Sequence, residues 1–234
     1  MNTIFYTNKG LRSKNEDCLL SEQLSPDISF HIIADGMGGY NHGEKAAKIV
    51  VDTLFDQISQ MDFSAIVEES IIGACERTNQ KLREEGTKLS SKIGATFAAV
   101  LILKDKAFAF WMGDSRVYQY NEHNLLLFQS EDHSLINELR LNRKLTANEI
   151  QKYDSIVTRS LTGETMEIPP QVEILHYSPN DKIFLCSDGL YKQINLNTII
   201  EMTHNDLLPY LASLEKKMND NYSIIIINSP VSQF

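Results

Sequence analysis

The chain has 234 residues, of which 42% are hydrophobic, and its 31 acidic residues outnumber its 22 basic ones to give a formal charge of −9. This length fits one globular domain over residues 1–234, and the net negative charge argues against binding nucleic acid or an anionic membrane. No stretch reaches the roughly 20 apolar residues of a membrane span, and the N-terminus lacks the layout of a signal peptide. The three cysteines, Cys18, Cys75 and Cys186, are widely spaced and suggest neither disulfides nor a thiolate metal site. We therefore expect a cytoplasmic protein.

The first half of the chain contains two runs of strand-like segments separated by two helices. The opening strands are TIFYT, CLLSEQL and ISFHIIAD, and turn residues between them suggest hairpin-like connections. Apolar residues at helical spacing then predict helices over 43–61 and from 63 to about 85. The second run comprises ATFAAVLIL, AFAFWMGD, RVYQYN and NLLLFQ, whose short connections favour antiparallel neighbours.

The rest of the chain begins with a helical pattern and ends with a strand. Residues 134–152 predict one or two short helices, in which Thr146 and Glu149 have the spacing of a capping box. VEILHY and DKIFLCSD predict another strand pair, helices are expected over 190–219, and SIIIIN closes the chain as a strand. Because strands and helices come in blocks, the pattern favours an antiparallel sheet with helices packed outside it over a doubly wound parallel fold.

Five acidic residues stand at the margins of these predicted strands. Asp35, Asp114 and Asp188 each follow an apolar run beside a glycine, whereas Asp17 and Asp220 each precede one. If the sheet ends bring these residues together, like charges in a poorly solvated place raise each other's pKa. A bound Mg²⁺ or Mn²⁺ removes that difficulty, since carboxylate and carbonyl oxygens suit these ions. The alternative is a set of dispersed turn residues, for which Asp and Gly are ordinary choices.

Eight motifs in order resemble those of the metal-dependent Ser/Thr protein phosphatases, the type 2C family. They are RSKNED, ADGMGG, GATFAAVLI, MGDSRVYQY, EDHSL, TRSLTG, SDGL and DNYSIII, and they extend from about residue 9 to 228. DGMGG is fairly specific and SDGL is weak, but eight motifs in the right order make coincidence a poor explanation. The compact length resembles the bacterial members. The resemblance implies an α+β fold, a four-layer αββα sandwich in which two packed antiparallel sheets are flanked by helices.

The resemblance also implies a metal centre at one end of this sandwich. Asp35 would bridge two Mn²⁺ or Mg²⁺ ions, and Gly36 would offer its carbonyl oxygen to one of them. Asp188 and Asp220 would complete the ligands of the other ion. Asp114, together with Asp188, would form a third metal site.

Three further residues receive roles from the same resemblance. Asp17 and Glu16 would act through water held by the ions, and Arg12 would grip the substrate phosphate with its planar fork. The reaction implied is hydrolysis of phosphoserine and phosphothreonine by a metal-activated water, without a phosphoenzyme. The partners implied are phosphorylated proteins, in particular a bacterial-type Ser/Thr kinase and its targets, and we expect a monomer.

The chain departs from the family pattern at several positions. Position 37 is Met, where eukaryotic members carry a His thought to protonate the leaving group, and a thioether cannot donate a proton. His42 and His133 are nearby in the motifs, and we expect both to be ordinary loop histidines. Ala95 and Tyr222 replace the usual residues of their motifs, and TRSLTG is one residue longer than the common form. None of these departures removes an expected metal ligand.

The flap region of the family corresponds to a segment at about 134–163. Its cations Arg140, Arg143 and Lys144 either steer acidic phosphopeptides or form the solvated face of a helix. Two other functions remain open, a catalytically silent module that binds phosphoproteins and a hydrolase of small phosphoesters. The complete set of acids favours the active protein phosphatase, because a silent module is free to lose metal ligands.

Overall fold

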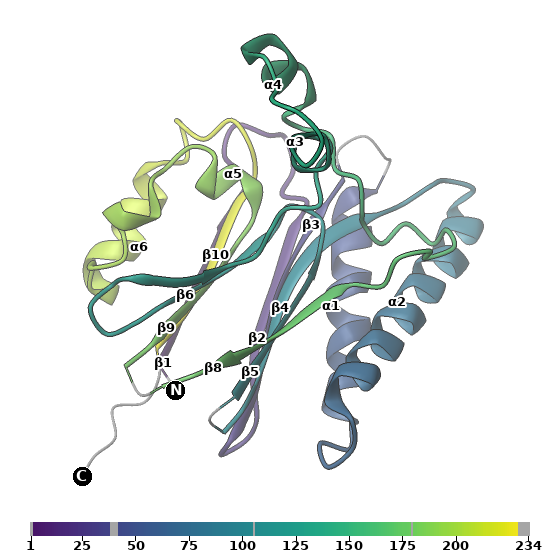
Figure 1. The fold of residues 1–234 in the computed structure, drawn as a ribbon, viewed down its shortest axis with the longest axis horizontal. Helices are drawn as coiled ribbons and strands as arrows, with labels where there is room; N and C mark the ends of the chain where they lie inside the picture. The colour runs from purple at the N-terminus through teal and green to yellow at the C-terminus, as the bar shows by residue number, and fades with distance from the viewer. Residues whose placement is uncertain (1, 38–41, 105, 179, 229–234) are drawn as a thin grey trace.

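Two five-stranded antiparallel sheets lie face to face at the centre of the protein (Figure 1). The computed structural model describes residues 2–37, 42–104, 106–178 and 180–228. In spatial order, the first sheet consists of β1 (Asn2–Asn8), β10 (Tyr222–Asn228), β9 (Lys182–Cys186), β6 (Arg116–Tyr120) and β7 (Leu126–Gln129). The second consists of β2 (Asp17–Ser25), β3 (Ile28–Gly36), β4 (Ala95–Leu103), β5 (Lys106–Met112) and β8 (Gln171–His176).

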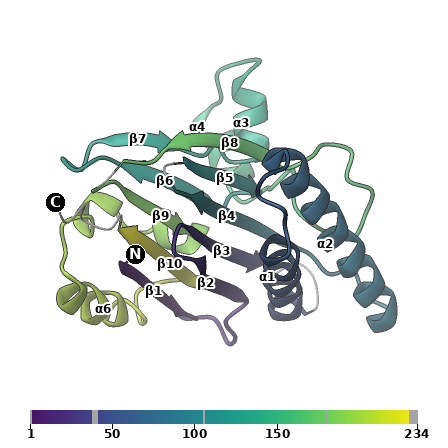
Figure 2. The same cartoon turned by 90° about the horizontal axis from the view of Figure 1, so that it is seen from below.

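Helices cover the outer face of each sheet (Figure 2). The second sheet carries α1 (Gly43–Ser59) and α2 (Val67–Leu89). The first carries α5 (Asp188–Tyr191), the 3₁₀ turn η1 (Leu196–Thr198) and α6 (His204–Ser213). Two short helices, α3 (Leu135–Arg140) and α4 (Ala147–Tyr153), stand beyond one end of the sheets (Figure 1). These layers confirm the predicted αββα sandwich.

The burial of the central strands explains their sequences. β3 and β4 are buried along nearly their whole length, because each has helices on one side and the other sheet on the opposite side. Such strands read as continuous apolar runs instead of alternating ones. Between the sheets the core includes Ile33, Val100, Trp111 and Ile225. Within the described ranges, no helix is both long and apolar enough to cross a bilayer.

Three predicted strand pairings are wrong. β1 pairs with β10 from the other end of the chain and forms no hairpin with β2. VEILHY and DKIFLCSD, which are β8 and β9, lie in different sheets. The short connection from β5 to β6 also changes sheet, at Gly113, whose φ of 121° is one that L side chains rarely adopt. Stacked sheets are only about 10 Å apart, so a short connection can join two sheets as readily as two neighbouring strands.

The helix predictions hold with small shifts. α1 begins at the predicted residue, whereas α2 begins and ends four residues later than predicted. At the start of α4, Thr146 and Glu149 form the predicted capping box, each side chain accepting a hydrogen bond from the other residue's backbone N–H.

Candidate active site

Asp17 and Asp35 are neighbours at the end of the second sheet. Asp17 begins β2 and pairs directly with Asp35 of β3, which pairs on its other side with Thr96 of β4. Side chains that face each other across antiparallel strands have Cβ atoms about 4.5–5.5 Å apart. The register alone therefore places these two carboxylates side by side.

The other expected residues reach the same end from both sheets. Asp188 follows β9, Asp220 precedes β10, and Asp114 lies in the connection between β5 and β6. A pocket of about 690 Å³ is lined by Arg12, Glu16, Asp35, Gly36, Met37, Asp114, Asp188, Asp220 and Asn221, among others. The pocket thus brings together every predicted site residue except Asp17, which is buried beside Asp35.

Asp17 is held between the two sheets by two serines. Its Oδ2 accepts hydrogen bonds from Ser187 Oγ at 2.7 Å and from Ser223 Oγ at 2.6 Å. Its Oδ1 is buried and has no hydrogen-bond partner in the part of the chain that the structure describes. Burial raises the pKa of Asp17 to about 7, against the opposing effect of the two serine hydrogen bonds. An unpartnered buried carboxylate oxygen is costly, and it suits a site that takes up water or a cation.

The carboxylates raise each other's pKa values. Burial, followed by the charges of Asp17, Asp188, Asp114 and Asp220, raises the pKa of Asp35 well above its usual range. Burial and the charge of Asp188 likewise raise the pKa of Asp114 to about 6. Among the described residues neither Asp17 nor Asp35 forms an ion pair with a basic side chain. The arrangement is unfavourable for the protein alone and calls for positive charge at Asp35.

Two basic side chains already balance part of this charge. Arg12 lies at the rim with its side chain 53% exposed, and its guanidinium is 2.8 Å from Asp220 Oδ2. Lys192 Nζ lies 2.8 Å from Asp188 Oδ2 and 3.2 Å from Asp114 Oδ2. The position of Lys192 was not predicted from the sequence, because a basic residue four positions after an acidic one indicates only a surface ion pair.

The donor set fits a hard divalent ion and requires ligands besides side chains. The available groups are carboxylate and carbonyl oxygens, which suit Mg²⁺ and Mn²⁺. Within the described ranges, no group of three or more His, Cys, Asp or Glu side chains is arranged so that it could hold an ion. Backbone and water oxygens must therefore contribute, as Mg²⁺ sites commonly require.

Glycines allow the backbone to approach closely around the pocket. A Cβ on Gly36 would collide with the backbone of Gly43, where α1 begins against the end of β3. A Cβ on Gly189 would collide with the carbonyl oxygen of Asn221, because the start of α5 lies directly against the start of β10. Any side chain at these positions would push apart the segments that carry Asp35, Asp188 and Asp220.

Asn221 is a site residue for which sequence reasoning gave no role. Its Nδ2 donates to the carbonyl oxygens of Lys9, at 2.9 Å, and Lys14, at 2.8 Å. Its Oδ1 accepts from the backbone N–H of Glu16 at 2.8 Å. One buried amide therefore fixes both ends of the segment that carries Arg12. The only available signal was its place beside Asp220 in the DN motif.

The two histidines near the motifs do not line the pocket. His133 is buried, and its Nδ1 accepts from the backbone N–H of Gly113 at 3.1 Å. Its ring stacks on Trp111, and burial lowers the pKa of His133 to about 4. His42 is exposed immediately before α1. Met37 does line the pocket, and its backbone N–H donates to Gly94.

The chain is similar to known proteins in both sequence and structure. The model of the protein phosphatase 2C family matches residues 11–223. Protein phosphatase PhpP of Streptococcus pneumoniae is 30% identical, over 84% of this chain and 81% of the relative, and serine/threonine phosphatase stp of Listeria monocytogenes is 26% identical, over 100% and 98%. The solved serine/threonine phosphatase of S. agalactiae has a TM-score of 0.84 and 27% identity, covering 98% of this chain and 99% of its own. A structure of phosphatase PstP with two manganese ions shares the fold, with a TM-score of 0.78 at 23% identity. The chain belongs to the protein phosphatase 2C family, whose members are metal-dependent Ser/Thr protein phosphatases.

Proposed function

We propose that this protein hydrolyses phosphoserine and phosphothreonine in proteins at a binuclear Mn²⁺ or Mg²⁺ site in the acidic pocket. The observation that carries the proposal is the convergence of carboxylates from both sheets on one pocket, with the Arg12 guanidinium at its rim. The raised pKa of Asp35 supports it, because this carboxylate has several acidic neighbours and no cationic partner among the described side chains. The two manganese ions in the PstP structure are consistent with the same ion count here.

In this proposal Asp35 would bind both ions. The Gly36 carbonyl oxygen would be a ligand of one ion, and Asp188 and Asp220 would be ligands of the other. Bound divalent ions would lower the pKa of water, so that hydroxide becomes available near neutral pH. Asp17, whose Oδ1 has no partner within the described residues, would hold water beside Asp35, and Glu16, which lines the pocket, would also act through water.

Arg12 is proposed to bind the substrate phosphate. Its side chain is half exposed, so most of its five N–H donors are free to face an incoming ligand. The planar guanidinium can donate to two phosphate oxygens at once. The present contact with Asp220 keeps Arg12 close to the acids, and a phosphate would replace the carboxylate as its acceptor.

The proton for the leaving hydroxyl must come from water in this proposal. Met37 lines the pocket, but its thioether has no proton to donate. His133 is neutral near pH 7, because its pKa is lowered to about 4, and its ring contacts Gly113 and Trp111 instead of the pocket.

The physiological partners belong to the same proposal. We infer that the substrates are phosphorylated proteins, including a Ser/Thr kinase and its targets, and that the protein acts as a cytoplasmic monomer. The names of the relatives in Listeria and Streptococcus support a protein phosphatase over a hydrolase of small phosphoesters. The complete acid set supports an enzyme over a silent phosphoprotein-binding module.

The decisive experiment is phosphate release from a phosphothreonine peptide by protein stripped of metal and then titrated with Mn²⁺ or Mg²⁺. We expect activity only with metal, and its loss in Asp188→Asn. Comparison with p-nitrophenyl phosphate and a nucleotide tests the small-phosphoester alternative. Folded protein that stays inactive at every metal concentration would support the silent module.

A further inference from the structure

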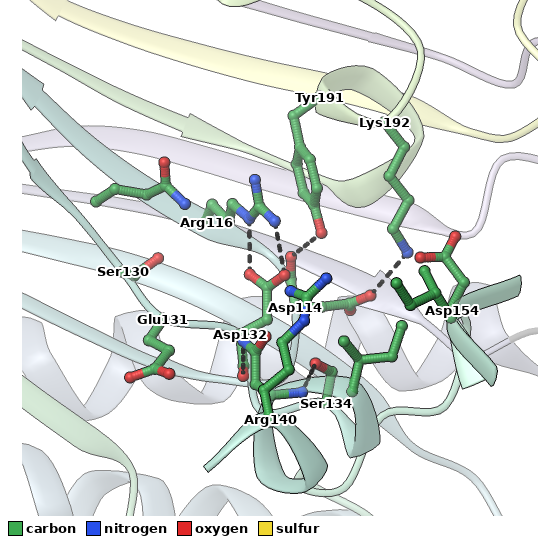
Figure 3. A pocket seen from close by; sticks show the side chains of 14 residues that line it. Asp114, Arg116, Ser130, Glu131, Asp132, Ser134, Arg140, Asp154, Tyr191 and Lys192 are labelled. Atoms are coloured by element: carbon green, nitrogen blue, oxygen red, sulfur yellow. Dashed lines mark hydrogen bonds and ion pairs between the residues drawn. The ribbon is translucent and has the colours of Figure 1, made fainter. Parts of the chain in front are cut away.

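Lys192 places its ammonium group between two acids of the site. It lies four residues after Asp188, at the end of α5, and bonds both Asp188 and Asp114. Figure 3 shows its side chain directed at the Asp114 carboxylate, at the boundary with a second pocket of about 370 Å³. The Lys192 side chain is 29% exposed, so the ammonium is held among protein groups and not in open solvent.

The surroundings fix the helical turn that carries this lysine. Tyr191 donates its hydroxyl to the backbone carbonyl of Asp114 at 2.9 Å. The guanidinium of Arg116 lies 3.6 Å from the centre of the Tyr191 ring, and Asp132 accepts two hydrogen bonds from Arg116 at 2.7 Å each (Figure 3). A bidentate ion pair and a stacked ring therefore hold α5 against the connection that carries Asp114.

The resemblance to the type 2C phosphatases implies a third divalent ion with Asp114 and Asp188 as its ligands. The Lys192 ammonium lies between these same two carboxylates. Each of these carboxylates already has an oxygen within 3.2 Å of Lys192 Nζ. The ammonium occupies Oδ2 of each carboxylate, so an ion between them would have to displace it, whereas neither contact involves Oδ1 of Asp188, which the binuclear site would use.

We propose that Lys192 is a built-in cation that takes the place of a third divalent ion between Asp114 and Asp188, so that the enzyme binds two ions and no more. This inference rests on the proposed binuclear site. Its ammonium donates to Asp188 Oδ2 at 2.8 Å and to Asp114 Oδ2 at 3.2 Å, so it supplies positive charge to both carboxylates. A fixed side-chain charge at this place makes activity independent of the supply of a third ion.

The test counts bound Mn²⁺ per chain and locates each ion. Metal-stripped protein is titrated with Mn²⁺ by calorimetry, and crystals grown with Mn²⁺ are examined for anomalous scattering. We expect two ions in the natural protein and a third, between Asp114 and Asp188, in Lys192→Met, which keeps most of the side-chain volume. Adding Asp114→Asn to Lys192→Met should return the count to two, and Lys192→Arg should keep it at two.

Lys48→Met is the matched control. Lys48 forms the same kind of pair with Asp52, four residues later, on the exposed face of α1, so its removal should leave the count at two. Three ions in the natural protein, or an anomalous peak between Asp114 and Asp188 with Lys192 displaced, would overturn the inference without the use of any variant. Two ions in a folded Lys192→Met would also overturn it. Fewer than two ions in the natural protein would instead overturn the binuclear site itself.

Discussion

The Asp35 carboxylate is an unfavourably placed charge in the metal-free protein. Burial and four acidic neighbours raise its pKa, so ionised Asp35 destabilises the fold near neutral pH. Asn has the same shape without the charge. We therefore expect Asp35→Asn to raise the free energy of unfolding in EDTA at pH 8, by about 1.4 kcal/mol for each unit that the pKa of Asp35 stands above its usual value. The same variant should lose metal-dependent phosphatase activity.

Urea unfolding and phosphate release on the same preparation check both expectations. Asp56→Asn, on the exposed face of α1, is the control and should change neither quantity. A fall in the stability of metal-free Asp35→Asn would show that this carboxylate is well accommodated without an ion, and near-normal turnover would remove it from the metal site.

Arg12 should affect substrate use without affecting metal binding. A hydrogen bond to a charged group contributes about 1.5–3 kcal/mol, so Arg12→Gln should lower kcat/KM for a phosphopeptide by roughly 10- to 150-fold. The number of bound Mn²⁺ ions should stay the same, because Arg12 is a cation at the rim and supplies no ligand. Steady-state kinetics and Mn²⁺ titration separate the two effects. Arg77→Gln on α2 is the control, and a loss of bound metal in Arg12→Gln would contradict the assignment.

The acids of the site were predictable from the sequence, and their supporting residues were not. Asp35 and Asp188 stand where an apolar run ends beside a glycine, so each can be identified from its immediate neighbours. Asn221 acts through the backbone of Lys9 and Lys14, more than 200 residues away in the chain. Lys192 contacts Asp114 across 78 residues. No local pattern encodes such contacts, because they arise only when the sheets assemble.

At the scale of elements, the segment between β1 and β2 depends on one amide. Asn221 satisfies three backbone groups of this segment, so Asn221→Ala leaves the carbonyl oxygens of Lys9 and Lys14 and the N–H of Glu16 without that partner. We expect faster hydrogen exchange over residues 9–16, a loss of roughly 1–3 kcal/mol of stability, and a higher KM because Arg12 is no longer held in place.

Exchange measured by mass spectrometry distinguishes this role from a general loss of stability. In Asn221→Ala the faster exchange should be confined to residues 9–16 and their contacts, while the central strands β3 and β4 stay protected. Asn219→Ala, on an exposed side chain two residues earlier, should leave exchange and KM unchanged. Unchanged exchange over residues 9–16 in Asn221→Ala would show that the amide does not position the segment.

Elements defined by their own periodicity were predicted well, and pairings between elements were not. The two long helices and the capping box at Thr146 follow from spacing within a few turns. Pairing depends on where the chain leaves one sheet for the other. Gly113 makes that change in a connection as short as a hairpin, so the sequence of β5 and β6 looks the same for either outcome. The partner of β1 is β10, at the opposite end of the chain.

At the scale of the whole molecule, buried acids and buried histidines set opposite pH dependences of stability. In the metal-free protein the pKa values of Asp17, at about 7, and Asp114, at about 6, lie above the usual value of 3.8, and that of Asp35 is raised as well. As the pH falls from 8, these acids therefore take up protons in the folded state before they do so in the unfolded state. The free energy of unfolding rises as the pH falls through these pKa values. Burial lowers the pKa of His31 to about 3 and that of His133 to about 4, both from 6.5. Their contribution is complete above pH 6.5 and is lost as pH falls toward 4.

We therefore expect the stability of the metal-free protein to rise as the pH falls from 8 to 6, at up to about 1.4 kcal/mol per pH unit for each proton exchanged, and to rise less steeply below pH 6, where the two histidines oppose the three acids. Saturating Mn²⁺ should reverse the slope between pH 6 and 8, because the ions bind deprotonated carboxylates and release their protons. Urea unfolding at half-unit pH steps, with EDTA and with Mn²⁺, tests both statements. Asp35→Asn should reduce this rise both above and below pH 6, because a raised pKa of Asp35 contributes to the slope from its usual value of 3.8 upward. If the stability of the metal-free protein instead rises steadily from pH 6 to 8, the acids of the site ionise with ordinary pKa values. Their mutual repulsion would then give no reason to expect a bound cation.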